Sequence, residues 1–302
     1  MEEKLSLQEW IRLAEQENKS FGDFCIEFQV NTLEIDKTAL LSRMEEMLYV
    51  MEQSVEIGLT GITSMGGLVG GNGKKIESYR AEAADKSIVG SVMSKAIMIA
   101  LAVGEANASM GRIVAAPTAG ASGTLPAVLF SLEEARGFSK LELAKALVVA
   151  GAIGMVIASR ASLSGAAGGC QAECGSAAAM AAGAAVELYG GSPRQVGQAV
   201  AITLKNMLGL VCDPVAGLVE VPCVKRNAGA AAQAMVAAEM ALAGIESVIP
   251  VDEVVDAMAA VGNAMSCTLK ETAQGGLAVS PTGLLLANKL FYKAESEKTS
   301  VN

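Results

Sequence analysis

The sequence predicts an all-α protein, a compact fold of many helices, on three observations. Helix-start signals recur along the chain, as in Ser139-x-x-Glu142 and Ser192-Pro193-x-Gln195. Runs rich in Val, Ile and Thr with alternating polarity, which are typical of strands, are almost absent. Glycine and alanine fill many of the apolar stretches, and such small residues let helices pack closely. We therefore expect several buried helices that are rich in these two residues.

The first 60 residues differ in composition from the rest of the chain. They are charged and amphipathic, and Ser6-x-x-Glu9 is a capping box that can open a first helix. Asp36 can cap a longer helix over residues 37–58, where Leu and Met recur at helical spacing as core-filling residues. We expect residues 1–60 to form an N-terminal helical arm, either a lid or a packing surface for a partner.

Further helices are expected at intervals over the remainder of the chain. Start signals and periodicity place them over residues 87–104, from Thr124 onward, from Ser139 to about Arg160, over 170–189, from Ser192 onward, over 226–243, over 252–261 and from Pro281 to about Glu295. No repeat period and no long linker interrupts them.

Composition argues against several classes of protein. Hydrophobic residues make up 52% of the chain, but the best uncharged run, Ala146–Ser159, has 14 residues, and a membrane span needs about 20. We therefore expect no membrane segment. A net charge of −9, no basic block and 4% aromatic residues argue against nucleic-acid binding. Six cysteines without an export signal predict reduced thiols and a cytoplasmic protein.

One absence limits the chemistry that the chain can perform, because it contains no histidine. Ser-His-Asp and Cys-His mechanisms and the usual catalytic zinc sites all need an imidazole. Proton transfer must therefore use Lys, Tyr, Cys, a carboxylate, water or a group from another chain.

Residues 162–231 are the expected chemical centre, since they hold four of the six cysteines among many glycines and alanines. Cys170 and Cys174 are spaced i, i+4 and would share one helix face. Cys212 and Cys223 flank a loop whose prolines and glycine argue against helix. A thiolate-only site suits an iron–sulfur cluster or structural zinc. The spacing matches neither the ferredoxin nor the zinc-ribbon pattern, so buried cysteines acting as small hydrophobic residues are the alternative.

Two loops rich in small residues could hold an anionic ligand. The first, residues 60–75, contains Ser64-Met65-Gly66-Gly67, whose backbone N–H groups could cradle a carboxylate, with a flexible connector as the alternative. The second, PTAGASGT at residues 117–124, precedes a helix whose N-terminus favours anions. An ordinary tight turn with an N-cap is the alternative there.

Four strings carry a family resemblance: NASMGRIVAAPTAGASGTLPAVL, SGAAGGCQAECGSAAAMAAGA, CDPVAGLVEVPCVKRNAGAA and KETAQGGLAVSPTG. Together they resemble the α chain of iron–sulfur-dependent L-serine dehydratase. The resemblance implies an all-α catalytic domain over residues 61–302, with a 4Fe–4S cluster held by loop-borne cysteines, and no need for PLP. By motif position the ligands would be Cys170, Cys212 and Cys223. The implied substrate-binding residues are Ser64, Met65, Gly66, Gly67, Thr118, Ala119, Gly120, Ala121 and Ser122.

The implied reaction is the deamination of L-serine to pyruvate and ammonia, a lyase reaction. Three cysteine ligands leave one iron open to act as a Lewis acid toward the serine hydroxyl while a base removes the α proton. The base is not identified in this chain, and a β chain is expected to supply a histidine, which implies a hetero-oligomer. Two alternatives stay open: a related lyase for L-threonine or L-cysteine, and a cluster-binding regulatory or scaffold module without turnover.

Other cysteines and polar residues lie near these motifs. Relatives more often carry an apolar residue at Cys174, so we expect it to be a buried neighbour rather than a ligand. Cys25 and Cys267 lie outside the ligand motifs and are expected to pack in the core. Lys270 and Glu271 are either polar groups of the site or part of a capped helix end.

Overall fold

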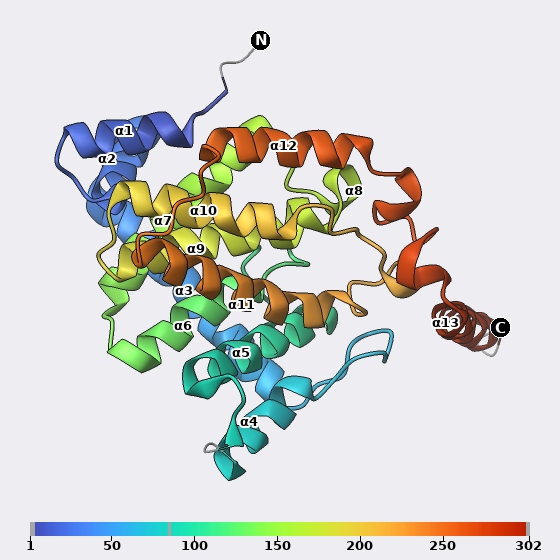
Figure 1. Ribbon diagram of the computed structural model, residues 1–302. Coiled ribbons are helices and arrows are strands. Elements are labelled where there is room, and N and C mark those ends of the chain that lie inside the picture. Colours follow the sequence, from blue (N-terminus) through green and yellow to red (C-terminus); the bar gives the residue numbers. More distant parts are fainter. Residues whose placement is uncertain (1–3, 84–85, 300–302) are drawn as a thin grey trace.

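The protein is described here by a computed structural model that covers residues 4–83 and 86–299, with side chains up to Phe291. Its α-helices are α1 (Leu7–Gln16), α2 (Phe21–Leu33), α3 (Lys37–Leu59), α4 (Asn72–Glu82), α5 (Gly90–Ala108), α6 (Thr124–Arg136), α7 (Lys140–Arg160), α8 (Gly165–Gly168), α9 (Ser176–Leu188), α10 (Pro193–Met207), α11 (Cys223–Leu242), α12 (Val251–Ala264) and α13 (Pro281–Thr299) (Figure 1). Short helical turns are η2 (Gln171–Gly175), η3 (Val215–Gly217), η4 (Cys267–Leu269) and η5 (Gly276–Val279). Within these residues β-pairing is confined to two isolated bridges, so the all-α prediction is confirmed.

The two strongest start signals form complete capping boxes. In α7 the Ser139 side chain accepts the N–H of Glu142, whose carboxylate accepts the N–H of Ser139 in return. In α10 Ser192 and Gln195 do the same, with a proline in the first turn. Each box satisfies two N–H groups that the first turn of a helix leaves without an intrahelical partner.

The arm's helix starts are confirmed in part. Asp36 caps α3 by accepting the N–H of Ala39. Ser6 caps α1 through the N–H of Glu9, but the Glu9 carboxylate pairs with Arg12 and not with the Ser6 backbone. The reciprocal half of the predicted box is therefore absent from α1, because a nearby guanidinium competes for the carboxylate.

Three helices were not predicted, namely α2, α4 and the four-residue α8. Helix α4 begins inside the expected glycine-rich loop, where the Glu105 carboxylate of α5 accepts the N–H groups of Asn72 and Gly73 at 2.8 and 3.2 Å. A carboxylate at a helix N-terminus stabilises the unpaired N–H groups there. Because this cap comes from a residue more than thirty positions away, local pattern does not reveal it.

The ligand-bearing segment also differs from expectation at two points. The helix expected over residues 170–189 begins with the π-helical turn η2 and becomes α-helical only at α9. Helix α11 begins at Cys223, three residues before the expected start. Cys223 is therefore the first residue of a helix and not a loop residue, whereas Cys212 lies in the loop that follows α10.

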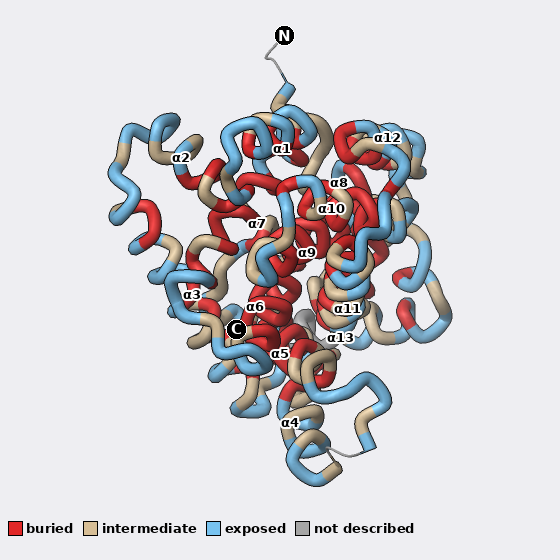
Figure 2. Tube along the Cα trace, turned by 60° about the vertical axis from the view of Figure 1, so that its left-hand side comes forward, coloured by how far each residue is buried: buried red, intermediate tan, exposed pale blue. Residues whose placement is uncertain are grey.

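Helix α9 lies at the centre of the molecule, and α6, α7, α10 and α11 pack around it (Figure 2). Its residues from Ser176 to Val186 are all buried, which confirms the expected burial of an alanine- and glycine-rich helix. Gly183 shows why small residues are required, since a Cβ there would lie 2.2 Å from Ile153 of α7. The close packing leaves no room for a larger side chain.

The N-terminal arm shares this core. Helix α1 packs on α10 and α12, and α2 and α3 pack on α7. The Asp252 carboxylate of α12 accepts the Ser6 hydroxyl at 2.6 Å and the Leu7 N–H at 3.0 Å. A domain boundary near residue 60 stays a prediction.

Helix α7 has 21 residues, whereas the uncharged run within it has 14. By length and composition alone it could cross a membrane, but 67% of its apolar window is buried inside the fold. It packs between α3, α2 and α9, as the core helix of a soluble protein does.

Candidate functional site

Three segments bring three cysteines together at one end of the helical body. Cys170 precedes η2, Cys212 follows α10, and Cys223 begins α11. They are only 2, 3 and 8% exposed. Burial is the main cause that raises the pKa of Cys212 and Cys223, and negative charge on Cys170 adds to it, so the three residues lie in one region of the fold. Their role as ligands stays a prediction.

Gln171 holds the Cys170 segment in place. Its buried side-chain amide donates to the Met258 carbonyl at 3.0 Å and accepts the N–H of Gly209 at 2.9 Å. Its own N–H donates to the Leu210 carbonyl at 2.9 Å. One residue therefore ties the π-helical turn to α12 and to the turn that leads to Cys212.

Residues 269–271 hold the Cys212 segment. The N–H of Cys212 donates to the Leu269 carbonyl, and the N–H of Glu271 donates to the Cys212 carbonyl, both at 2.8 Å. The charge of Glu271 raises the pKa of Cys212 and of Glu173, so this carboxylate belongs to the surroundings of the site. Lys270 pairs with Cys212 in an isolated bridge, and it also caps the short turn η4 through its N–H, which donates to the Cys267 carbonyl, so the expected capped end is present.

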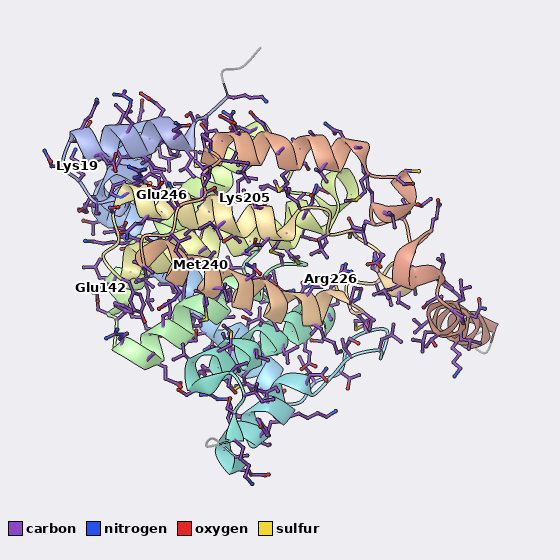
Figure 3. The ribbon with its side chains drawn as sticks, viewed as in Figure 1. Lys19, Glu142, Lys205, Arg226, Met240 and Glu246 are labelled. Atoms are coloured by element: carbon purple, nitrogen blue, oxygen red, sulfur yellow. The ribbon has the colours of Figure 1, made fainter. Side chains whose placement is uncertain are left out.

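Arg226 is the positive charge of this region, and Figure 3 shows it toward the N-terminal end of α11. Its guanidinium donates to the Val211 carbonyl at 2.7 Å and pairs with Asp213 at 2.8 Å. Burial acts to lower the pKa of Arg226, but the Cys170 thiolate and Asp213 outweigh it and raise the pKa. A cation that stays charged here offsets the charge of deprotonated thiols.

The four buried thiols of the region have different proton affinities. A hydrogen bond with Cys174, followed by the charge of Arg226, lowers the pKa of Cys170, although burial acts against this. The same hydrogen bond and burial raise the pKa of Cys174, so Cys174 keeps its proton. Burial raises the pKa of Cys212 well above its usual value and that of Cys223 to about 12. Ligand binding at these two cysteines must therefore displace protons.

The remaining cysteine predictions have mixed outcomes. Cys25 is buried, as expected, but Cys267 is exposed on the surface segment η4, so core packing is wrong for it. Residues 265–277 form only short turns and one isolated bridge, and none of the residues of η4 is buried. The role of Cys174 as a neighbour of Cys170 and not a ligand stays a prediction.

Thiols are donors that either an iron–sulfur cluster or a single zinc ion can use. In the part of the chain that the structure describes, no three Cys, His, Asp or Glu side chains are close enough to hold one metal ion. A zinc ion needs its sulfur ligands about 2.3 Å from one point, whereas thiols at the corners of an iron–sulfur cube lie farther apart. Three buried thiols beside one arginine have the donor chemistry that such a cluster needs, and the cluster itself stays a prediction.

The first loop already holds a carboxylate, and it belongs to the chain itself. Glu220 accepts the Ser64 hydroxyl at 2.5 Å and the N–H groups of Gly66 and Leu68 at 2.7 and 3.0 Å. The N–H groups of Met65 and Gly67 donate to carbonyl oxygens of Ala108 and Ser64. The predicted anion cradle therefore exists, with Glu220 in it.

The second loop has donors to spare. Among the described hydrogen bonds, none involves the N–H groups of Thr118, Ala119, Gly120 or Ala121, whereas the Ser122 N–H donates to the Ala119 carbonyl. The Ser122 hydroxyl is buried and has no partner. Unengaged N–H groups just before a helix are typical of an anion-binding nest.

Sequence reasoning missed Glu173, which lies between this loop and the cysteines. Its carboxylate accepts the Thr118 hydroxyl at 2.5 Å. A Cβ at Gly120 would lie 2.7 Å from the Glu173 carboxylate. A Cβ at Gly165 would lie 3.2 Å from that carboxylate and 3.0 Å from the Cys212 sulfur. Burial raises the pKa of Glu173, and the charge of Glu271 adds to this. One signal was available, since Glu173 is the only charged residue between Arg160 and Glu187.

A cavity of about 290 Å³ lies on the other side of the segment that carries Cys170. Gly168 and Ala172 line it, together with Arg160 and Asn263. None of the predicted site residues lines this cavity. The predicted site residues range from the buried cysteines to the exposed Met65, and this cavity lies apart from them.

Comparisons with known proteins identify relatives of this chain. A profile of the family described as "Serine dehydratase alpha chain" matches residues 2–278. The "Probable L-serine dehydratase, alpha chain" of Bacillus subtilis (strain 168) is 49% identical over 299 residues, 98% of this chain and 99% of that protein. The "L-serine dehydratase, alpha chain" of Peptoniphilus asaccharolyticus is 44% identical over 263 residues, 86% of this chain and 89% of that protein. The longer "L-serine dehydratase 2" of Escherichia coli (strain K12) is 48% identical over 184 residues, 60% of this chain and 40% of that protein.

Proposed function

The chain belongs to the serine dehydratase alpha chain family, and on that basis we propose that it deaminates L-serine to pyruvate and ammonia, as the α chain of a two-chain enzyme. The names of its relatives support the substrate and the second chain. The single observation that carries the proposal is the position of Glu173, which accepts the Thr118 hydroxyl of the second loop and lies in the turn η2 directly after Cys170. We place the enzyme in the cytoplasm, where free thiols stay reduced.

We propose that the three cysteines hold a 4Fe–4S cluster. A cluster with three protein ligands supplies an iron with an open position, which is a Lewis acid for the serine hydroxyl. The lowered pKa of Cys170 favours its thiolate, and Arg226 offsets the charge of the ligands. The reaction then needs neither PLP nor a Schiff-base lysine.

The second loop is the proposed seat of the substrate carboxylate. The unengaged N–H groups of Ala119, Gly120 and Ala121 and the unpartnered Ser122 hydroxyl are suitable donors, and helix α6 begins directly behind them. Thr118 would orient Glu173 toward this seat. The residues Ser64–Gly67 of the first loop would line one side of the site. Most of their N–H and O–H donors already bond to Glu220 or to backbone carbonyl oxygens.

Glu173 is the carboxyl group of this chain that is best placed to move a proton at this seat. Its raised pKa lets it take up and release a proton more readily near neutral pH than an ordinary glutamate does. The general base for the α proton would be either Glu173 or a histidine of the β chain, because this chain has no histidine.

The cofactor proposal is tested by anaerobic reconstitution with iron and sulfide. The parent chain and a Cys174→Ala variant should gain the broad absorption of thiolate-bound iron near about 400 nm, and Cys212→Ala should not. Because Cys212 and Cys174 are both buried, the pair also controls for damage to packing. A Cys212→Ala chain that holds its cluster while Cys174→Ala loses it would reverse the two roles.

The reaction is tested by a pyruvate assay of the reconstituted chain with and without its partner. We expect turnover of L-serine only with the partner, and weaker competition from L-threonine and L-cysteine. Full turnover by the isolated chain would contradict the shared site. A cluster-loaded complex that forms no pyruvate from any of the three amino acids would favour the regulatory or scaffold alternative.

A further inference from the structure

Two polar side chains flank Cys223 in the sequence, and neither has yet been given a role. Glu220 lies three residues before it and Asn227 lies four residues after it. They are 3% and 0% exposed, which is costly for a carboxylate and an amide unless each is fully hydrogen-bonded. Each finds its partners in a different small-residue loop.

Glu220 is an internal anion in the nest of the first loop. Three donors converge on its carboxylate, the Ser64 hydroxyl and the N–H groups of Gly66 and Leu68. The fit is close, because a Cβ at Gly66 would lie 2.7 Å from a Glu220 oxygen. Because these three donors already serve the Glu220 carboxylate, none of them is left for a second carboxylate.

Asn227 binds the second loop in a complementary way. Its side-chain oxygen accepts the Gly123 N–H at 3.0 Å and the Thr124 hydroxyl at 3.1 Å. Its side-chain nitrogen donates to the Gly120 carbonyl at 2.8 Å and to the Cys223 carbonyl at 3.0 Å. All four hydrogen-bonding positions of the amide are used, and one reaches the ligand residue itself.

We propose that Glu220 and Asn227 are positioning residues that fasten the two loops to the segment carrying Cys223. The first loop is then a mount for Glu220, and the second alone is free to receive the substrate carboxylate. The role in positioning rests on the proposed function, whereas the hydrogen bonds of Glu220 and Asn227 do not depend on it. It assigns the two loops different roles, where sequence alone gave both the same one.

The structural part of the inference is tested by hydrogen–deuterium exchange on the full reconstituted chain. In Glu220→Gln an amide nitrogen replaces one acceptor oxygen and faces a donor of the loop. Exchange at the N–H groups of Gly66 and Leu68 should therefore rise about tenfold, which corresponds to the loss of one hydrogen bond, while Gly123 stays protected. In Asn227→Ala exchange at Gly123 should rise, while Gly66 and Leu68 stay protected. Glu239→Gln is the matched control, since it removes the same charge at an exposed position of α11.

Unchanged exchange at Gly66 and Leu68 in Glu220→Gln would overturn the proposal. If this variant does not fold, Ser64→Ala removes one of the three bonds from the loop side and should give a smaller change at the same sites. A rise that spreads equally over both loops in either variant would also contradict separate attachment.

The functional part is tested by kinetics of the complex with the partner chain. Loss of positioning should lower kcat by about tenfold or more in Glu220→Gln, with KM for serine changed less than about twofold. A variant that binds serine more tightly than the parent would overturn the proposal, because it would show that substrate competes with Glu220 for the nest. If the parent complex forms no pyruvate, the proposed function fails while the exchange experiment still decides the attachment.

Discussion

At the scale of single residues, Glu173 decides much of the character of the site. It stands in a stretch of glycine and alanine, in the π-helical turn that directly follows Cys170. That turn directs its carboxylate at Thr118, fifty-five residues away in the sequence. π-Helical turns often occur at functional sites, where one extra residue re-aims the neighbouring side chains.

A Glu173→Gln substitution should separate stability from activity. The folded-state pKa of Glu173 is raised, so its ionisation destabilises the fold increasingly as pH rises through that pKa. Glutamine keeps an acceptor for the Thr118 hydroxyl and carries no charge, so thermal stability at neutral pH should be equal or higher. Turnover should fall by about 100-fold or more if the carboxyl moves a proton.

The measurement is a melting curve and a pH profile of kcat for the parent and the Gln variant. The acidic limb of the parent profile should lie above the ordinary glutamate pKa of 4.5 and should vanish in the variant. A variant with parental kcat would assign the proton chemistry to the partner chain.

At the scale of helices, glycine positions set how closely neighbours approach. Gly58 of α3 lies against the backbone of α5, where a Cβ would be 2.0 Å from the Ala102 carbonyl oxygen. The backbone of a core helix cannot move aside as the end of a side chain can. The α3–α5 contact therefore fastens the arm to the body through a residue without a side chain.

Gly58→Ala should destabilise the protein by about 1–3 kcal/mol, because the two helices must separate to admit a methyl group. Gly229→Ala is the matched control, since nothing lies within 4 Å of a Cβ at that exposed position of α11. There alanine should be neutral or stabilising by about 0.5–1 kcal/mol through helix propensity. Denaturant unfolding measures both, and equal effects of the two substitutions would disprove the close approach.

At the scale of the whole molecule, the arm and the site lie on different parts of one core. Helix α1 packs on α10 and α12, and Asp252 fastens its first turn. Cys212 and Cys223 lie where the chain passes from the C-terminal end of α10 to α11, whereas Ile11 of α1 lies beside Gly197, nearer to the N-terminal end of α10. The arm can therefore stabilise the fold without contact to the chemistry.

Asp252→Asn tests this division. It weakens two charge-assisted hydrogen bonds to α1, so the free energy of unfolding should fall by about 1–3 kcal/mol. Pyruvate formation and cluster absorption below the melting temperature should stay at parental values. A loss of activity without a loss of stability would instead make the arm part of the active centre.

The fold was largely predictable from sequence, for local reasons, whereas the cysteine ligands stay a prediction. The caps at Ser139 and Ser192 depend on residues three positions apart, and the burial of α9 follows from its composition. The start of α4 was not predictable, because its cap is Glu105 from another helix. Nor was the exposure of Cys267, because burial depends on what packs over a segment.

The sequence by itself thus determined most of the helices, the family and the set of thiols, because each depends on residues that are close together along the chain. The tertiary structure alone decided which polar groups meet them. It placed Glu173 between Thr118 and the cysteines, and it filled the first loop with Glu220. The physical reason is that a buried carboxylate must find donors wherever the fold brings them, and those donors lie 55 to 156 positions away along the chain.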